Sequence, residues 1–164
     1  DLLDLSRSDS GPMENDLVNI EELVKATLAS ADDRIKLEVS NSAQGGLVMG
    51  DKRRLAQVLD NLLRNAEKYG DGATRIVVTS TGTDIEIAVE DDGPGVAPSE
   101  RELIFERFTR GAAARKRGTG DGAGLGLALV DEHARRHGGS AHVEGKEGQP
   151  GARFVVSLPK AGHR

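Results

Sequence analysis

Apolar side chains recur along this chain with two periods, and each period predicts a different kind of element. A period of about 3.6 residues is typical of amphipathic helices. It predicts helices over 18–30, 51–69 and 124–137, and a short helix over 99–106. Strands are predicted where apolar and polar residues alternate, as in IKLEVS at 35–40. The other predicted strands are 74–80, 84–90, 140–146 and 152–158, with a shorter candidate at 46–49.

The residues at the ends of these segments support the predicted boundaries. Asn19 and Asp51 stand at helix starts, where their side chains can accept from free N–H groups of the first turn. Gly70 and the pair Gly138-Gly139 follow helices, where glycine commonly ends the last turn. Antiparallel strand pairs joined by short turns predict an α/β fold, with a mostly antiparallel sheet and helices on one face.

The composition excludes several classes of protein. The chain has 164 residues, the length of one domain, and no cysteine, which excludes a disulfide scaffold and a thiolate metal site. A net charge of −5 argues against nucleic-acid binding by the domain as a whole. No apolar run is long enough to span a membrane, and the four scattered histidines predict no zinc site. The chain begins at Asp1, so we expect a piece of a longer protein.

The helix predicted over 51–69 carries two separate stripes. The apolar stripe consists of Leu55, Val58, Leu59, Leu62, Ala66 and Tyr69. The second stripe consists of Asn61, Asn65 and Lys68, whose spacing places them along one line of the helix. An amide oxygen suits Mg²⁺ when substrate phosphates supply most of the negative charge, and a lysine one turn away can meet a phosphate. The alternative interpretation is a solvated helix face.

Two glycine-rich segments are the next candidates for binding. Asp91-Asp92-Gly93-Pro94-Gly95 follows a predicted strand, and a carboxylate at a strand end can accept from an exocyclic amine. GTGDGAGLGL at 118–127 runs into the last helix, so its amides and the helix N-terminus suit an anion. The alternative interpretations are a plain Asp-Gly turn and a flexible linker.

Segment 107–121 differs from the rest of the chain in charge. Its net charge is +4, so the remaining residues carry −9. A basic segment on an acidic domain suits a polyanion such as a triphosphate. A loop that is charged only for solubility is the alternative interpretation.

Six segments carry a resemblance to one known family. They are LLDLSRSDSG at 2–11, LDNLLRNAEKYG at 59–70, VEDDGPGV at 89–96, IFERFTRG at 104–111, GAGLGLALV at 122–130 and GARFVVSLP at 151–159. In this order they resemble the end of the second dimerisation helix with its linker, the N box, the first glycine box, the F box, the second glycine box and the closing strand of bacterial sensor histidine kinases. The resemblance covers nearly the whole chain and implies the ATP-binding catalytic domain of such a kinase.

The resemblance implies a Bergerat fold, a two-layer α/β sandwich with a mixed sheet, that binds ATP with Mg²⁺. On the phosphate side, Asn65 would bind Mg²⁺, and Asn61 and Lys68 would meet the phosphates. Arg110 would approach the terminal phosphates and, with Lys68, stabilise them. The glycine box that wraps the phosphates corresponds to Gly122, Gly124, Leu125 and Gly126. The box is longer here than the family's usual GTGLGL.

On the adenine side, the resemblance implies a second group of contacts. Tyr69 would lie by the base, and Asp91 would accept from its amino group. Gly93 and Gly95 would make room for the base. The residues that would anchor a lid over the nucleotide are Phe105 and Phe108.

The resemblance also implies boundaries and partners. Residues 1–11 would be the end of a dimerisation helix and its linker, 12–160 the catalytic domain, and 161–164 a tail. The family's His-Glu phosphoacceptor box is absent, so the nucleophile and its acidic neighbour would lie upstream of residue 1. The implied partners are the protein's own dimerisation helices and a response regulator, in the cytoplasmic part of an inner-membrane sensor kinase.

Two other functions are weighed against this one. A serine-directed anti-sigma-type kinase or a gyrase-like ATPase of the same superfamily is disfavoured by the F box and by LLDLSRSDSG. A non-catalytic nucleotide-binding scaffold is disfavoured by Asn65, Asp91 and the glycine boxes.

Overall fold

In the computed structural model, the chain is built around one five-stranded sheet. The structure describes residues 11–31, 34–106, 123–146 and 148–162, and for 123–125 only the backbone. The strands, in order across the sheet, are β2 (Lys36–Val39), β4 (Ala73–Ser80), β5 (Asp84–Asp91), β7 (Ala152–Pro159) and β6 (Ser140–Gly145). β2 is parallel to β4, and the other neighbouring pairs are antiparallel. The sheet is therefore mixed and mostly antiparallel, as predicted.

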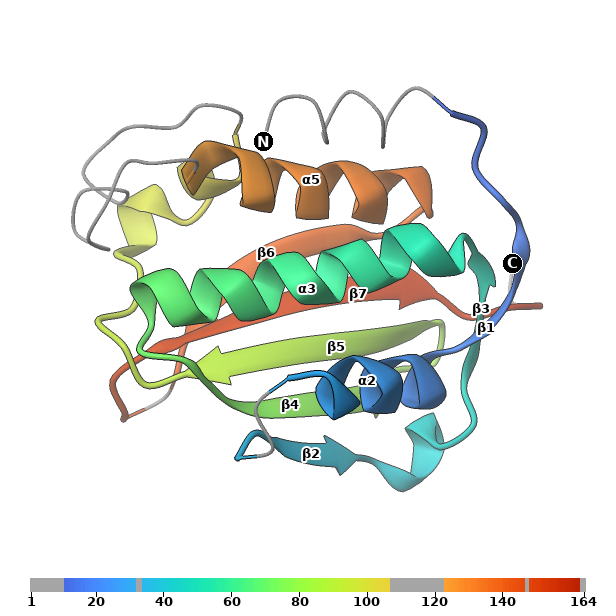
Figure 1. The fold of residues 1–164 in the computed structure, drawn as a ribbon, viewed down its shortest axis with the longest axis horizontal. Coiled ribbons are helices and arrows are strands. Elements are labelled where there is room, and N and C mark those ends of the chain that lie inside the picture. Colours follow the sequence, from blue (N-terminus) through green and yellow to red (C-terminus); the bar gives the residue numbers. More distant parts are fainter. Residues whose placement is uncertain (1–10, 32–33, 107–122, 147, 163–164) are drawn as a thin grey trace.

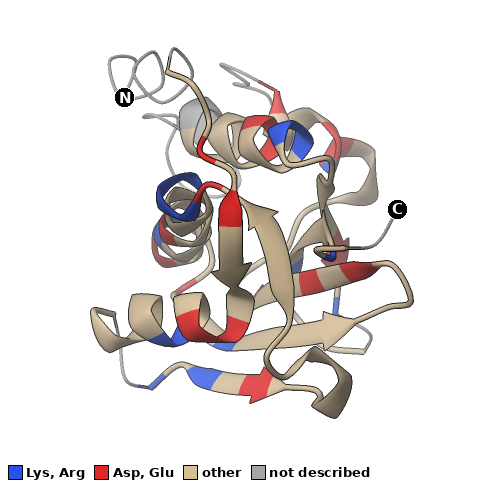
Figure 2. Cartoon of the chain, turned by 90° about the vertical axis from the view of Figure 1, so that its right-hand side faces the viewer, with Lys and Arg blue, Asp and Glu red and all other residues tan. Residues whose placement is uncertain are grey.

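In the described ranges, three α-helices lie on one face of this sheet (Figure 1). They are α2 (Ile20–Ala29), α3 (Lys52–Tyr69) and α5 (Ala123–Arg136). A separate ribbon of β1 (Asp16–Asn19) and β3 (Leu47–Gly50), paired antiparallel, lies at the end where α3 begins. Seen from that end, the basic start of α3 lies beside acidic positions near β1 (Figure 2). The two-layer α/β sandwich confirms the predicted fold class.

The core lies between the sheet and the helices, because α3 turns its apolar stripe inward. Leu55, Val58, Leu59, Leu62 and Ala66 on that stripe are only 1–2% exposed. Leu55, Val58, Leu59 and Leu62 belong to one apolar cluster with the inward-facing side chains of the strands, which include Ile76, Val78, Ile85, Ile87, Val89, Phe154, Val156 and Leu158. Each large side chain buried in this way stabilises the fold by about 1.5–3 kcal/mol. The stripe therefore fixes which side of α3 rests on the sheet.

The predicted capping residues are confirmed. Asn19 Oδ1 and Asp51 Oδ1 accept from N–H groups in the first turns of α2 and α3, at 3.0 and 3.2 Å. Each side chain thus satisfies a free donor of its helix. α5 ends in a Schellman motif, in which Gly138 has φ 80° and the N–H of Gly139 donates to the carbonyl of Ala134 at 2.8 Å.

The prediction of a helix over 99–106 is wrong. The chain forms two 3₁₀ turns there, η2 (Pro98–Glu100) and η3 (Leu103–Phe105). A first helical turn fixes several residues for one hydrogen bond, so a segment this short gains too little to form a lasting α-helix. The turns nevertheless bury Ile104 and Phe105, which accounts for the helix-like apolar pattern.

Strand β1 is absent from the predicted elements, and the helix predicted from residue 18 begins at Ile20. Val18 and Asn19 pair instead with Val48 and Leu47 of β3. This pairing joins segments that are far apart in the sequence, and a local pattern carries no sign of it. Tertiary pairing therefore overrides the helical period at this boundary.

The second face of the sheet carries paired charges. Glu90 on β5 accepts hydrogen bonds from Arg75 on β4 and from Arg153 on β7. Burial by itself would raise the pKa of Glu90, but the two guanidinium groups outweigh burial and lower it. A face on which charges pair across neighbouring strands needs no covering layer, which fits a sandwich of two layers.

Candidate functional site

Three elements bring their ends together at one end of the sandwich. Figure 1 shows the C-terminal ends of α3 and β5 and the first turn of α5 at the same end of the molecule. Both α5 and β5 contact α3. α3 contributes Asn61, Asn65, Lys68 and Tyr69, and β5 contributes Asp91. Candidate residues from separate sequence segments therefore lie in one region.

The polar line on α3 is buried at its middle residue. Asn65 is 7% exposed, Asn61 is half-buried and Lys68 is exposed. Among the described residues, Nδ2 of Asn65 has no hydrogen-bond partner. A buried polar group without a partner costs about 1–3 kcal/mol. Half a turn of the amide exchanges its N and O, so the same position can offer an oxygen to a cation. Such a residue fits ligand binding better than a solvated helix face.

Asp91 ends β5 with its side chain fully enclosed, 0% exposed. Its Oδ1 accepts from the N–H of Gly93 at 3.0 Å and from the N–H of Ala152 at 3.2 Å. Two donors on one oxygen fix the plane of the carboxyl group, and with it the direction of Oδ2. The carboxyl group is therefore held in a set orientation, which a plain exposed Asp-Gly turn would not provide.

Glycines allow the backbone to close around this carboxyl group. A Cβ on Gly70 would lie 2.4 Å from Cγ of Asp91, and a Cβ on Gly93 would lie 2.4 Å from Cα of Gly70. Gly95 has φ 78°, a conformation that favours glycine. The end of α3 and the turn after β5 therefore pack closely against each other and against the side chain of Asp91.

The second glycine-rich segment ends inside α5 rather than before it. α5 begins at Ala123, so Gly124, Leu125 and Gly126 belong to its first turn. The N–H groups of a first turn are free to bind a ligand, and the helix dipole makes them positive. A Cβ on Gly126 would lie 3.5 Å from Oδ1 of Asn61, so this turn faces the polar line of α3. Outside the described residues lie Phe108, Arg110 and Gly122.

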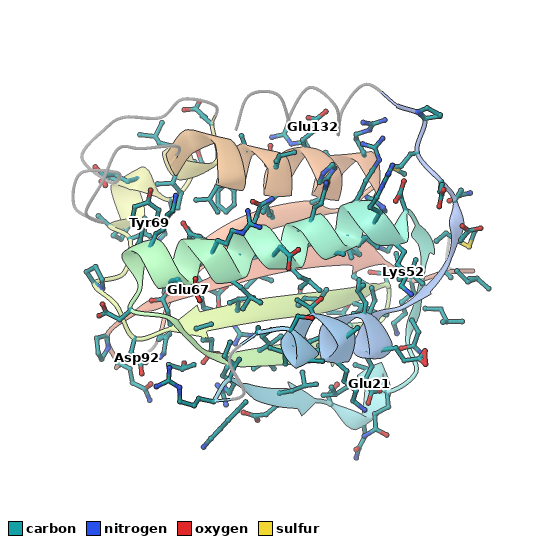
Figure 3. The ribbon with its side chains drawn as sticks, in the orientation of Figure 1. Glu21, Lys52, Glu67, Tyr69, Asp92 and Glu132 are labelled. Atoms are coloured by element: carbon teal, nitrogen blue, oxygen red, sulfur yellow. The ribbon has the colours of Figure 1, made fainter. Side chains whose placement is uncertain are left out.

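Two aromatic residues border the region. Tyr69 is the last residue of α3 and is 7% exposed; Figure 3 shows it at the same end of the molecule as Asp92. Phe105 in η3 is 8% exposed and meets Phe154 of β7 edge-on, with the ring centroids 6.3 Å apart. Phe105 therefore holds the last described turn before residue 107 to the core.

Sequence reasoning missed the turn between β6 and β7. Lys146 follows β6 directly, and its Nζ donates to the carbonyl oxygen of Asp91 at 3.1 Å. A Cβ on Gly151, in the same turn, would lie 1.9 Å from that oxygen. Lys146 and Asp91 are 55 positions apart, and no motif links them. The Gly-Gln-Pro-Gly run at 148–151 signals a tight turn, but it does not show what the turn contacts.

The region offers different chemistry at its two sides. On one side, a buried carboxylate with a fixed plane can accept from an amine. On the other, the first turn of α5 and the exposed Lys68 suit negative charge. A ligand that joins an amino-substituted base to several phosphates matches both sides.

The sequence of the chain matches one known protein family. Residues 50–162 match the model described as histidine kinase-, DNA gyrase B- and HSP90-like ATPase. The chain belongs to this family of ATPases. The matched range contains α3, β5 and α5, and thus the candidate residues described above.

Within this ATPase family, histidine kinases are among the proteins to which the chain is similar. MprB of Mycobacterium sp. (strain KMS), a signal transduction histidine-protein kinase/phosphatase, is 39% identical over 166 residues, which cover 97% of this chain and 32% of MprB. The sensor-like histidine kinase SenX3 of Mycobacterium bovis is 39% identical over 148 residues, 87% of this chain and 36% of SenX3. The chain spans about a third of the length of these relatives.

A solved domain agrees with the fold. The ATP-binding domain of PrrB from Mycobacterium tuberculosis superposes with a TM-score of 0.69 and 31% identity, over 89% of this chain and 97% of that domain. The chain is thus an ATP-binding catalytic domain of the histidine-kinase type, as the resemblance implied. Across the described ranges, no helix combines the length and the apolar character needed to cross a membrane.

Proposed function

We propose that this chain binds ATP with Mg²⁺ and presents the γ-phosphate to a histidine on dimerisation helices that precede it in the whole protein. One observation carries the proposal: a buried amide, a buried carboxylate and the first turn of a helix meet at one end of the fold. They are supplied by Asn65, Asp91 and α5. The histidine kinases among the relatives support the same function.

The base is recognised at the end of β5. Asp91 accepts from the exocyclic amine of adenine, and the two N–H donors on Oδ1 support this role because they set the direction of Oδ2. Tyr69 lies beside the base, and the turn with Gly93 and Gly95 keeps the backbone close to it. Because a buried acceptor penalises a ligand that leaves it unpaired, this arrangement selects ATP over nucleotides without the amine.

The phosphates are bound between α3 and α5. Asn61 and Lys68 approach them from one side, and the first turn of α5, with Gly124, Leu125 and Gly126, approaches from the other. The residues that join from outside the described ranges are Arg110 and Gly122, with Phe108 as a second anchor beside Phe105. Lys68 and Arg110 bring positive charge to the γ-phosphoryl group that is transferred.

Asn65 is the residue that holds Mg²⁺ in this proposal. Its buried amide, whose Nδ2 has no partner among the residues described, fits a ligand that is completed by a bound cation. When bound, Mg²⁺ neutralises charge on the triphosphate during transfer. An amide contributes no charge of its own, which suits a cation whose charge is already balanced by phosphates.

The domain supplies position and charge, and the nucleophile comes from elsewhere. A histidine nitrogen on the upstream helices forms the new N–P bond, ADP leaves, and an acidic neighbour takes the histidine proton. His133 and His137 of this chain are 0% and 8% exposed, so neither is accessible as an acceptor. The phosphoryl group then passes to a response regulator, and the whole protein is an inner-membrane sensor kinase with this domain in the cytoplasm.

The test is phosphotransfer between separate polypeptides. The chain is incubated with labelled ATP and Mg²⁺, alone and with the upstream helices of the whole protein. We expect ATP binding without label on the chain alone, and acid-labile label on the helices. The transfer should be slow, because separation removes the effective concentration of order mM that a short linker provides. Helices whose acceptor histidine is replaced by glutamine serve as the control.

Three results would contradict the proposal. Acid-labile label on the chain alone would place the acceptor within these residues. No transfer at high concentrations of both polypeptides would favour a nucleotide-binding scaffold, and label on a serine of the partner would favour a serine-directed kinase.

A further inference from the structure

One lysine ties the turn between β6 and β7 to the turn that follows β5. Nζ of Lys146 donates to the carbonyl oxygen of Asp91 at 3.1 Å and also to Oδ1 of Asp92. The side chain of Lys146 is 10% exposed, whereas that of Asp92 is 60% exposed. The ammonium group is therefore enclosed on the inner side of the turn, and its carboxylate partner faces outward.

The two contacts fix the peptide that joins Asp91 to Asp92. The carbonyl of the first residue and the side chain of the second share one ammonium group, so a rotation of this peptide would carry the carbonyl away from an ammonium group that the Asp92 carboxylate holds in place. The same stretch of backbone leads to Gly93, whose N–H donates to Oδ1 of Asp91. Lys146 thus steadies one of the two donors that set the plane of the carboxyl group.

The second donor comes from the far side of the turn that Lys146 begins. Ala152, at the start of β7, donates its N–H to Oδ1 of Asp91 at 3.2 Å. The turn is closed on itself, since the N–H of Gln149 donates to the carbonyl of Lys146 at 3.2 Å. Gly151 brings it so close that a Cβ there would lie 1.9 Å from the carbonyl oxygen of Asp91. The turn that Lys146 begins therefore leads to the second donor on Oδ1, while the Lys146 side chain itself holds the peptide that leads to the first.

We infer that Lys146 is a positioning residue for base recognition. Through the peptide between Asp91 and Asp92, it sets the direction in which the Asp91 carboxylate meets the amine of adenine. Lysine suits this position because an ammonium group donates to a carbonyl and a carboxylate at once, whereas a methionine of similar length donates to neither. The inference rests on the proposed function, which pairs Asp91 with the amine.

The test compares two nucleotides on two proteins. Calorimetry in Mg²⁺ measures the affinity for ATP and for purine riboside triphosphate, which lacks the exocyclic amine. The unaltered chain should bind ATP at least about tenfold more tightly than the analogue. Lys146→Met should weaken ATP binding about fivefold, the effect of about one hydrogen bond, and leave the analogue within about twofold. The preference for ATP should then fall to a few-fold.

Three further variants separate positioning from charge and from stability. Lys36→Met removes an exposed lysine on β2 and should leave both affinities unchanged. Lys146→Arg keeps donors for the carbonyl and the carboxylate, so it should restore part of the preference for ATP. Asp92→Asn keeps the hydrogen bond from Lys146 to the Asp91 carbonyl, so its preference for ATP over the analogue should be intermediate. If Lys146→Met does not fold, the preference of Asp92→Asn tests the inference in its place. Thermal unfolding of each variant checks that the fold is intact.

The outcomes distinguish the inference from the function on which it rests. Equal losses for ATP and the analogue in Lys146→Met would overturn the inference, since they would indicate a general attraction for phosphates or a general loss of stability. An unchanged preference for ATP would overturn it as well. If the unaltered chain shows no preference for ATP, the role proposed for Asp91 fails instead.

Discussion

The two ends of α3 both bury polar groups, but they satisfy them differently. At the N-terminal end, Asp51 and Arg54 are 1% and 2% exposed and pair with each other. In the C-terminal half, Asn65 is 7% exposed, and its Nδ2 has no partner in the part of the chain that the structure describes. A buried polar group with partners stabilises a fold, whereas one without partners costs free energy unless a ligand completes it. The contrast suggests that one end serves the fold and the other serves binding.

The N-terminal end of α3 is a closed network. Asp51 Oδ2 accepts from the N–H of Glu14 at 3.0 Å, and Nη2 of Arg54 donates to the carbonyl of Gly11 at 2.8 Å. His137, at the end of α5, accepts the N–H of Asp51 at its Nε2, 3.1 Å away. The network joins the first described residues of the chain to α3 and α5, at the end seen in Figure 2. Changes here should alter stability and leave nucleotide affinity intact.

The largest expected effect comes from breaking this network. Arg54→Met leaves the carboxylate of Asp51 buried without its cationic partner, which should lower the free energy of unfolding by about 3 kcal/mol. Urea unfolding measures the loss. Arg53→Met is the matched control, because Arg53 is the exposed neighbour in the same turn and should change stability by less than about 0.5 kcal/mol. If folded Arg54→Met binds ATP much more weakly than the unaltered chain, the proposed division of roles between the two ends of α3 is wrong.

In the C-terminal half of α3, we expect a substitution to weaken nucleotide binding without lowering stability. Asn65→Ala should weaken binding of ATP with Mg²⁺ by about 1–3 kcal/mol, since a ligand of the cation is lost. The free energy of unfolding without nucleotide should not fall, because the removed amide nitrogen is buried and has no partner among the described residues. Calorimetry and urea unfolding give the two values. Glu67→Ala, an exposed position two residues further along α3 (Figure 3), is the control. Unchanged affinity in Asn65→Ala would remove this residue from the site.

The sequence predicted most accurately those features that depend on residues close together in the chain. The apolar stripe of α3, its cap at Asp51 and its end at Gly70 depend on neighbours within a few residues, and all three are confirmed. The parallel pairing of β2 with β4 was not predicted specifically, and β1 was missed, because both depend on segments brought together only in the fold. Local periodicity also suggested a helix at 99–106, where the segment is too short to sustain one.

The candidate site also combines residues that can be found from the sequence with features that only the fold reveals. Asn61, Asn65 and Lys68 form a line within one helix, and Asp91 follows directly on a strand, so a reader of the sequence can find them. That Asn65 is buried while Lys68 is exposed depends on packing, and spacing alone does not show it. Lys146 reaches Asp91 only because β6 lies next to β7 and β7 next to β5. The roles assigned to all of these residues stay predictions until nucleotide binding is measured.

Lowering the pH also tests the N-terminal end of α3, and its effect on stability is expected to be the smallest of those considered. Burial alone would raise the pKa of Asp51, but the N–H groups of Glu14 and Arg54, together with the Arg54 guanidinium, outweigh burial and lower it. A carboxyl group whose pKa is lowered by folding contributes stability above its unfolded pKa and loses that contribution as the pH falls through the folded pKa. Acidification below about pH 4, the range of an unperturbed Asp, should therefore remove the contribution of this group to the stability of the fold.

Asp51→Asn isolates this contribution, since it keeps the size of the side chain and removes the charge that titrates. The difference in unfolding free energy between the unaltered chain and Asp51→Asn should be constant from about pH 7 to pH 5 and shrink below about pH 4. Other carboxyl groups, among them Glu90 with its own lowered pKa, titrate in both proteins and cancel in this difference. At the C-terminal half of α3, Asn65 does not titrate, so the same comparison with Asn65→Ala should show no dependence on pH. A difference for Asp51→Asn that stays level to pH 3 would mean that folding does not lower the pKa of Asp51, so neither the N–H donors nor the Arg54 guanidinium would favour the charged carboxylate over the neutral acid.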